Sequence, residues 1–483
     1  MKRIAAAAAA LVFLAAPLAG CAEGEKTVTL RVSSWEEYID LGDWDETIDL
    51  ESGDITGVNS MVDDFTEWFN STHDYKVKVE YSTFGTNEDL YNRLSLGDKY
   101  DLVCPSDYMI MKLLAEDKLE KFSDEFLESG EHTQNVSPYI ADIFESYGWT
   151  EYAACYMWGT SGFVYNPDLL VNDDDISSCG ILLNHDYNRS VTIKDNVRDA
   201  YFAALSIINR DRLTAGLSSE QLSAYLNDTD SATIALAEDV LKSIKDNVYS
   251  FETDSGKADM VTGKVTANYQ WSGDAVYILD EADADEVSLW YAVPEECSNL
   301  WFDGWVKLKD GIDGDVKRDE AAEAFVNFLA KSENAIRNMY YIGYTSAIAT
   351  DTVFEYMDWN YGAETDDTLD YDLSYFFGDG CVLTADAENF DGENRGRQLF
   401  AQYPPANVIE RSVVMLDFGD KLAEINRMWI NVRCPDLKDV SPAVWGVIGA
   451  IAGASAIAVC LYIFRYRIFT ARRPKKGYEK VTK

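Results

Sequence analysis

The sequence predicts an α/β fold in two lobes, followed by one transmembrane helix. Residues 78–122 follow the order strand, helix, strand, helix, and such units build parallel sheets. About 420 residues lie between the two ends of the chain, which is too many for one hydrophobic core and fits two lobes. A charge-free run at residues 443–464 is long enough to cross a bilayer.

The βαβ unit begins with a half-buried strand whose apolar residues alternate, at Val77, Val79 and Tyr81. A helix follows, with leucines at roughly helical spacing, at Leu90, Leu94 and Leu96. The next strand, residues 101–104, is short and apolar and ends at Pro105. Because ligands of parallel sheets bind at the carboxyl ends of the strands, residues 106–108 occupy a binding position.

Short motifs that follow one another in a fixed order extend this pattern along the chain. They are Ser34-Trp35-Glu36-Glu37-Tyr38, Tyr81-Ser82-Thr83, Asp101-Leu102-Val103-Cys104-Pro105-Ser106-Asp107-Tyr108, Trp158-Gly159-Thr160, Arg198-Asp199, Gln270-Trp271-Ser272-Gly273, Trp301-Phe302-Asp303 and Ile342-Gly343-Tyr344. In this order they resemble the extracytoplasmic spermidine/putrescine-binding proteins of polyamine ABC importers. The resemblance covers roughly residues 28–435. It implies a periplasmic-binding-protein-like fold with a ligand cleft between the lobes.

The resemblance also implies a ligand and partners. A linear polyamine would bind in the cleft, and the closed protein would dock on an ABC permease driven by a cytoplasmic ATPase. Aromatic rings can hold the methylenes and charge of such a ligand, while carboxylates bind its ammonium ends. The residues that match the family's cleft positions, together with two departures from them, are Trp35, Glu36, Tyr38, Ser106, Tyr108, Asn196, Asp199, Trp271, Trp301, Asp303 and Tyr344.

The two departures leave the choice of polyamine open. Asn196 stands where the family has a carboxylate, and Glu36 occupies a position that is usually small or hydroxylated. The total charge of the cleft can therefore be unchanged while its location shifts. A receptor for another organic cation, such as a basic amino acid or a quaternary amine, is the alternative within the same class.

The solute-binding domain is expected at residues 22–441. We expect lobe 1 at about 28–148 and 306–345, and lobe 2 at about 149–305 and 346–435, with strands crossing between them near Trp158-Gly159 and at residues 301–305. A helix in lobe 1 should bury an apolar stripe of Ala321, Ala324, Phe325, Phe328 and Leu329. Residues 40–64 form an acidic insertion that we expect to be a surface loop.

Both ends of the chain indicate a membrane-anchored protein. Residues 1–21 resemble a lipoprotein signal peptide ending at Cys21, which would carry the lipid; an ordinary cleaved signal is the alternative. The transmembrane helix at 443–464 precedes a basic tail, 465–483, that the positive-inside rule places in the cytoplasm. The body would therefore face outward from a bacterial cytoplasmic membrane, held at both ends. An anchored adhesion or surface protein that reuses the fold is the alternative from another class.

Charge argues against nucleic-acid binding. Of the 41 Lys and Arg, two precede residue 22 and eight follow residue 464, whereas only one of the 84 Asp and Glu lies in these end segments. The body therefore has a net charge of about −52, which repels nucleic acid and anionic lipid and attracts cations. A surface adapted for solubility or for high salt would give the same excess of acidic residues.

The sequence contains no catalytic or metal-binding pattern. Its three histidines are far apart and have no metal-ligand spacing, and no nucleophile elbow or phosphate-binding loop occurs. We therefore expect no enzyme, no metal and no cofactor. Six cysteines of the body allow 15 full disulfide pairings, and the sequence does not choose among them.

Overall fold

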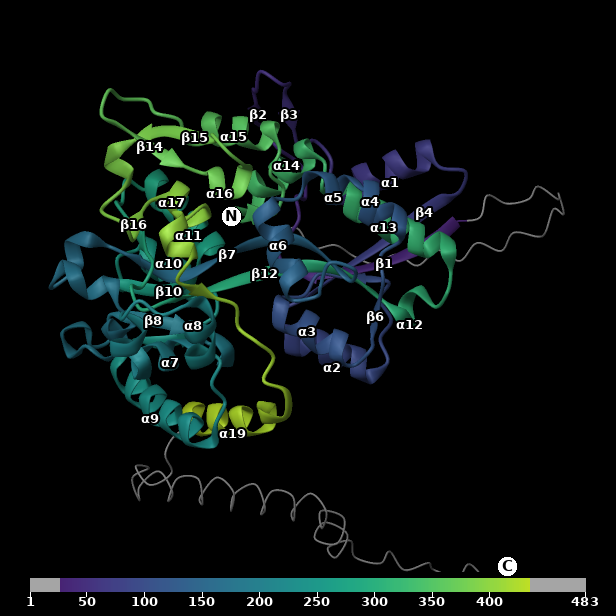
Figure 1. Cartoon of the computed structure of the whole chain (residues 1–483). Helices are drawn as coiled ribbons and strands as arrows, with labels where there is room; N and C mark the ends of the chain where they lie inside the picture. Colours follow the sequence, from purple (N-terminus) through teal and green to yellow (C-terminus); the bar gives the residue numbers. More distant parts are fainter. Residues whose placement is uncertain (1–26, 435–483) are drawn as a thin grey trace, which may run out of the picture.

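The computed structural model describes residues 27–434, in which one mixed sheet runs through two α/β lobes (Figure 1). The strands of its main path follow the order β4-β1-β5-β12-β7-β10-β8-β9. In Figure 1, lobe 1 lies to the right and contains the first three of these strands, and lobe 2 lies to the left. The two-lobed α/β fold predicted from the sequence is confirmed.

Lobe 1 is built on the βαβ unit expected from the sequence. Strand β1 (Thr27–Trp35) is parallel to both β4 (Lys76–Phe84) and β5 (Leu102–Val103). Between β4 and β5, helix α2 (Asn87–Leu96) begins at Thr86, whose side chain accepts a hydrogen bond from the amide of Asp89. It ends at Gly97, which adopts a left-handed conformation.

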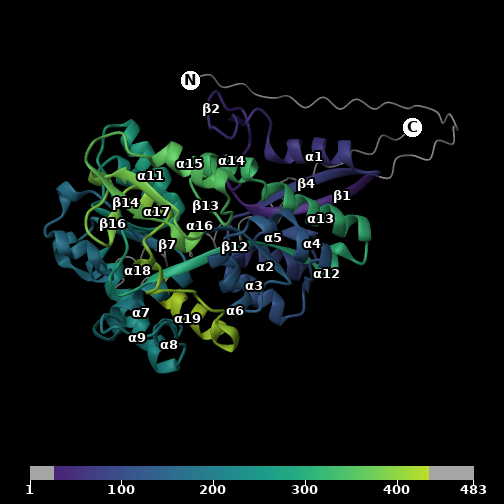
Figure 2. The ribbon, with the colours of Figure 1, turned by 45° about the horizontal axis from the view of Figure 1, so that its top comes forward.

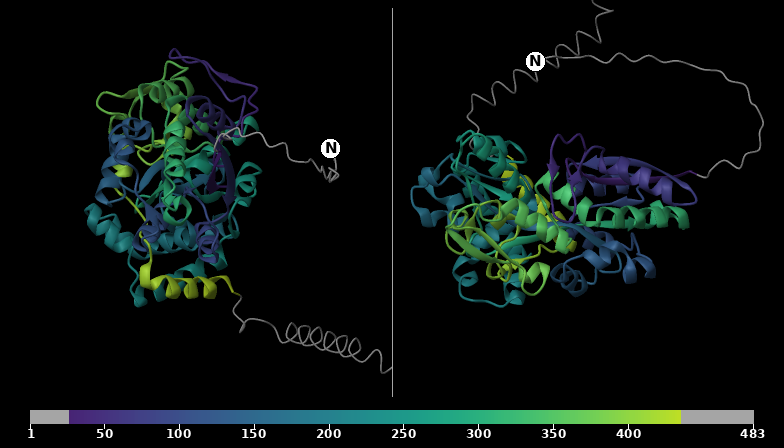
Figure 3. Two further views of the ribbon diagram at one scale, coloured as in Figure 1. Left: turned by 90° about the vertical axis from the view of Figure 1, so that its right-hand side faces the viewer. Right: turned by 90° about the horizontal axis from the view of Figure 1, so that it is seen from above.

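Helices cover lobe 1. Seen from above (Figure 3, right), α1 (Met61–Thr72) and α13 (Val316–Leu329) lie side by side. Four of the five stripe residues predicted on α13 are buried, and Ala324 is partly buried. Phe325 packs edge-on against Phe65 with ring centroids 4.9 Å apart. The other lobe 1 elements include β6 (Leu119–Glu120), α3 (Asp107–Ala115), α4 (Asp124–Ser129), α5 (Glu131–Asn135), α6 (Pro138–Ser146) and α12 (Lys309–Ile312).

Two long antiparallel strands connect the lobes. Every residue of β7 (Ala153–Tyr165) and β12 (Ser298–Leu308) is buried, and Trp301 lies opposite Gly159. The pairing register shifts between Asp303 and Gly304, the kind of irregularity that re-aims side chains near functional sites. The crossing strands expected near these residues are therefore present.

Lobe 2 carries a second parallel region. Strand β8 (Val191–Lys194) is parallel to β9 (Ser250–Glu252) and to β10 (Ala267–Trp271). Helices pack around it, and α19 (Leu422–Arg433) returns to lie against α9 (Ser231–Asn247), as Figure 2 shows. The other elements of this lobe are α7 (Val197–Leu213), α8 (Ser219–Leu226), α10 (Ser255–Val261), α11 (Ser272–Ala284), β11 (Trp290–Ala292), β16 (Arg395–Gly396), α17 (Gln398–Gln402), α18 (Ala406–Ile409) and β17 (Ser412–Val413).

The acidic insertion is more ordered than the predicted surface loop. It forms the hairpin of β2 (Thr47–Ile48) and β3 (Ile55–Thr56), whose isoleucines are buried. The buried carboxylate of Asp40 pairs with Arg337 of α14 (Ser332–Ile342) at 2.6 Å. Near the hairpin in Figure 1 lie α15 (Asp351–Tyr361), β14 (Thr368–Asp372), α16 (Ser374–Phe377) and β15 (Val382–Asp386), while β13 (Thr345–Ser346) pairs with β7.

Within residues 27–434, no helix combines the length and the apolar character that crossing a membrane requires. The predicted signal peptide with Cys21, the predicted span at 443–464 and the predicted tail at 465–483 lie outside the described residues. All six cysteines of the described part are free thiols, and four of them are buried.

Candidate ligand-binding site

The first part of the candidate site is a group of rings around Asp303. The hydroxyl of Tyr38 donates a 2.6 Å hydrogen bond to Oδ2 of Asp303. The ring of Tyr344 lies 5.1 Å from that of Tyr38 and 5.6 Å from that of Trp301. Trp301 and Asp303 are two residues apart on β12, so both point to this side of the strand.

Asp303 is a buried carboxylate without a cation. Its Oδ1 has no hydrogen-bond partner in residues 27–434, and no Lys or Arg of this part lies within ion-pair distance. Burial raises the pKa of Asp303 to about 6, although Ser106 and Tyr38, which favour the charged form, oppose the shift. The group is therefore ionised at pH 7 while lacking a positive partner.

The second part lies where α7 begins. The side chain of Asn196 accepts a 2.8 Å hydrogen bond from the amide of Arg198 and so caps the helix. Asp199, in the first turn, is buried and accepts a 3.2 Å hydrogen bond from Nε1 of Trp271. Burial raises the pKa of Asp199 to about 6, while Trp271 and the charges of Lys194 and Arg198 lower it.

Asp274 connects the two parts. Its carboxylate accepts a 3.1 Å hydrogen bond from the hydroxyl of Tyr344 and pairs with Lys194 at 3.3 Å and Lys257 at 3.0 Å. Burial raises the pKa of Asp274, but the two lysines outweigh it, and the pKa lies below its usual value. Gly273 makes room for this contact, because a Cβ there would lie 2.2 Å from the ring of Tyr344.

A cation–π contact at Tyr108 also joins the two lobes. The guanidinium of Arg198 lies 3.5 Å from the ring centroid of Tyr108 and 4.2 Å from that of Phe418. Arg198 also pairs with Asp417 at 3.3 Å. Tyr108 belongs to α3 of lobe 1 and Arg198 to α7 of lobe 2, so this cation–π contact holds the two lobes together.

The remaining predicted residues lie at the edges of these groups. Ser106 forms an isolated β-bridge with Asp303. Trp35 packs on Phe84 with ring centroids 5.0 Å apart, and Glu36 is exposed to solvent. The side-chain oxygen of Asn196, another predicted ligand residue, caps helix α7.

Sequence reasoning missed Lys194, Arg198 and Asp274 as members of the site. Lys194 ends β8 and Trp271 ends β10, and these strands are parallel neighbours. The rule that ligands bind at the carboxyl ends of parallel strands could have identified Lys194 as it identified residues 106–108. Nothing in the sequence indicated that β8 and β10 are neighbours, because more than 70 residues separate them.

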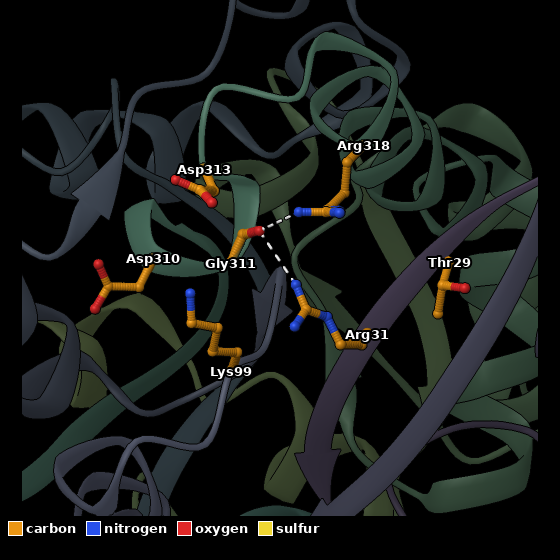
Figure 4. A pocket seen from close by; sticks show the side chains of 7 residues that line it. All are labelled: Thr29, Arg31, Lys99, Asp310, Gly311, Asp313 and Arg318. Atoms are coloured by element: carbon orange, nitrogen blue, oxygen red, sulfur yellow. Dashed lines mark hydrogen bonds between the residues drawn. The ribbon is translucent and has the colours of Figure 1, made fainter.

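A surface pocket on lobe 1 is separate from this site (Figure 4). Its three cations are matched by carboxylates: Asp310 and Asp313 line it, and the buried Asp101 pairs with Arg31 at 2.5 Å. A pocket with balanced charge offers little to a polycation. Its lining residues are Thr29, Arg31, Lys99, Asp310, Gly311, Asp313 and Arg318. In the part of the chain that the structure describes, no group of His, Cys, Asp and Glu could hold a metal ion.

Comparison with known proteins places the chain among receptors for solutes. Curated relatives include the spermidine/putrescine-binding periplasmic protein of Salmonella typhimurium, 25% identical over 65% of this chain and 76% of the relative. The putrescine-binding periplasmic protein SpuD of Pseudomonas aeruginosa is 26% identical over 69% of this chain and 82% of its own length. The solved Tp0655 (TpPotD) lipoprotein of Treponema pallidum shares the fold, with a TM-score of 0.56 at 18% identity over 84% of this chain and 99% of that one.

The family model of bacterial extracellular solute-binding proteins matches residues 60–359, which is more than half of the chain. The match includes Tyr108, Asp199, Trp271, Asp303 and Tyr344, and so spans most of the candidate site. The chain belongs to the family of bacterial extracellular solute-binding proteins.

Proposed function

We propose that this protein binds a linear polyamine between its lobes and delivers it to an ABC-type permease. The observation that carries the proposal is the pair Asp199 and Asp303. Both are buried, neither has a cation within ion-pair distance in the described residues, and each accepts a hydrogen bond from an aromatic side chain. Two buried carboxylates beside rings are suited to a ligand with two ammonium groups joined by methylenes.

The expected binding free energy is sufficient for a transport receptor. A ring face contributes about 0.5 to 2 kcal/mol to cation binding, and a charged hydrogen bond about 1.5 to 3 kcal/mol. Two carboxylates and two or three rings, less the entropy lost on binding, reach about −8 kcal/mol, which is micromolar affinity. The printed names of the curated relatives, which are spermidine- or putrescine-binding proteins, support the same ligand class.

We also propose the arrangement around this site. The two lobes, divided as the sequence predicts, would close on the ligand, and the closed form would dock on a permease coupled to a cytoplasmic ATPase. A lipid at Cys21 and a helix at 443–464 would hold the domain at the outer face of the membrane, with residues 465–483 in the cytoplasm. These anchors rest on the sequence alone. Protease added to intact spheroplasts should digest the domain and spare a tag fused after Lys483.

Titration calorimetry on the full chain in mild detergent tests the ligand. The panel is putrescine, cadaverine, spermidine, arginine and choline, each at low and at physiological salt. Micromolar binding of an amine with two or more ammonium groups, retained at the higher salt, is the expected result. Tighter binding of arginine or choline would assign another cation, and only weak heats that vanish with salt would refute a specific site.

A further inference from the structure

Lys194 is a buried lysine inside the candidate site. Its Nζ donates a 2.6 Å hydrogen bond to the carbonyl of Thr253 and lies 3.3 Å from Oδ2 of Asp274. It also lies 4.3 Å from the ring centroid of Trp271. The side chain is 1% exposed. A lysine of the protein thus makes the three contacts that a bound ammonium group makes: a carboxylate, a carbonyl oxygen and an aromatic face.

The other charges of the site show what remains for a ligand. Asp274 already pairs with Lys194 and Lys257, so its charge is compensated. Asp107 is buried and accepts hydrogen bonds from the amides of Tyr108 and Phe302, but burial outweighs them and raises its pKa to about 8, so it is mostly protonated at pH 7. Two buried carboxylates of the site therefore remain negative and without an ion pair, namely Asp199 and Asp303.

We propose that Lys194 occupies one ammonium position of the site and thereby limits the ligand to two ammonium groups, which makes this protein a receptor for linear diamines. One end of the diamine would bind at Asp303 among Tyr38, Trp301 and Tyr344. The other would bind at Asp199 beside Trp271. A triamine would bring its third ammonium toward a region where Lys194 already supplies a positive charge. This inference rests on the proposed polyamine function and narrows it.

Lys257 provides a matched control. Its Nζ pairs with Oδ1 of the same Asp274, at 3.0 Å, but its ring contact is with Tyr277 and its side chain is 24% exposed. Removing Lys257 therefore deletes one positive charge from the same carboxylate without vacating the face of Trp271. A purely electrostatic or structural role of Lys194 would be shared by Lys257, whereas occupation of an ammonium position would not.

The experiment is calorimetric titration of the full chain in mild detergent with putrescine, cadaverine and spermidine. We expect the wild type to bind putrescine or cadaverine, whichever of the two it binds more tightly, at least about 10-fold tighter than spermidine. The third ammonium of spermidine would meet the like charge of Lys194. Lys194→Ala should reduce this preference by at least about 10-fold by vacating the position. Lys257→Ala should change the preference by less than about 3-fold.

The outcomes separate this inference from the proposed function. If no polyamine binds to the wild type, both fail. If polyamines bind but the wild type prefers spermidine, or prefers the diamine by less than the stated factor, only the role of Lys194 is refuted. The same holds if Lys194→Ala and Lys257→Ala change the preference equally. If circular dichroism shows that Lys194→Ala does not fold, the wild-type preference and the Lys194→Arg variant test the inference instead. The arginine variant keeps the positive charge, so it must bind diamines in preference to spermidine.

Discussion

The hydroxyl of Tyr38 donates its hydrogen bond to a carboxylate 265 residues away, that of Asp303, at 2.6 Å. Tyr38 follows the first strand of lobe 1, and Asp303 lies on the strand that crosses between the lobes. The hydrogen bond leaves one oxygen of Asp303 without a partner in the described residues, although the group is buried and ionised at neutral pH. A ligand ammonium would complete this arrangement.

Asp303→Asn should weaken polyamine binding by about 2 to 4 kcal/mol, because it removes a desolvated partner of the ligand's charge. Asp54, exposed in the hairpin, is the matched control: Asp54→Asn makes the same change in net charge and should cost almost nothing. Calorimetry on both variants at two salt concentrations makes the comparison. Equal, small losses that disappear at high salt would leave only nonspecific attraction to an acidic surface.

Binding should weaken as the pH falls through about 6, because the pKa values of Asp199 and Asp303 lie near 6 and an ammonium binds the charged forms. If both carboxylates contribute fully, affinity falls about 100-fold between pH 7.5 and pH 5. Titrations across this range measure the change. Affinity that stays constant down to pH 5 would mean that neither carboxylate binds the ligand.

The same shift predicts the opposite trend for the stability of the ligand-free protein. Burial raises the pKa of Asp303 from 3.8 to about 6, so the folded state holds the proton more tightly than the unfolded state. Its contribution to the free energy of unfolding is present below pH 4 and falls by about 3 kcal/mol as the pH rises through 6 to 7. Asp303→Asn removes this loss, so the variant's stability relative to wild type should rise over that window in chemical denaturation. If the free energies of unfolding of Asp303→Asn and wild type differed by the same amount at pH 4 and at pH 7, this prediction would be wrong.

Tyr38→Phe should move the pH midpoint of binding upward by about one unit, because the lost hydrogen bond stabilised the charged form of Asp303. Tyr156→Phe is the control. The Tyr156 ring lies 5.6 Å from that of Tyr38, but its hydroxyl donates to the backbone carbonyl of Tyr38 and not to a carboxylate. The control midpoint should stay where it is. A downward shift for Tyr38→Phe would be incompatible with the assigned role.

Arg337→Met should destabilise the fold by about 3 to 5 kcal/mol, because it leaves the buried carboxylate of Asp40 without a cation. Arg337 also pairs with Asp64 at 2.7 Å, so the change releases both ends of the acidic insertion. Lys421→Met, which breaks the exposed pair with Glu424, should cost less than about 1 kcal/mol. Urea denaturation of both variants tests this, and a comparable small loss in each would show that Asp40 tolerates losing Arg337.

Local patterns allowed much of lobe 1 to be predicted. Strand alternation at Val77 to Tyr81, leucine spacing in α2 and the apolar stripe of α13 depend on neighbouring residues, whose periodicity is set by the backbone. The surface-loop prediction for residues 40–64 fits their many exposed positions, but it missed the β2–β3 hairpin and the ion pair of Asp40. The order of this insertion depends on Arg337, which lies some 270 residues further along the chain.

For the site, the sequence by itself determined which rings and carboxylates are available. Each of the motifs around Trp35, Asp199, Trp271 and Asp303 is a short continuous stretch of the chain. Tertiary structure alone decided their partners. Strand β10 pairs with β8 in parallel, and this pairing places Lys194 over the ring of Trp271 and next to Asp274. The physical reason is that a charge acts over a few ångströms in space, whatever the separation along the chain. Only the folded sheet fixes those distances, and with them which carboxylates remain free for a ligand.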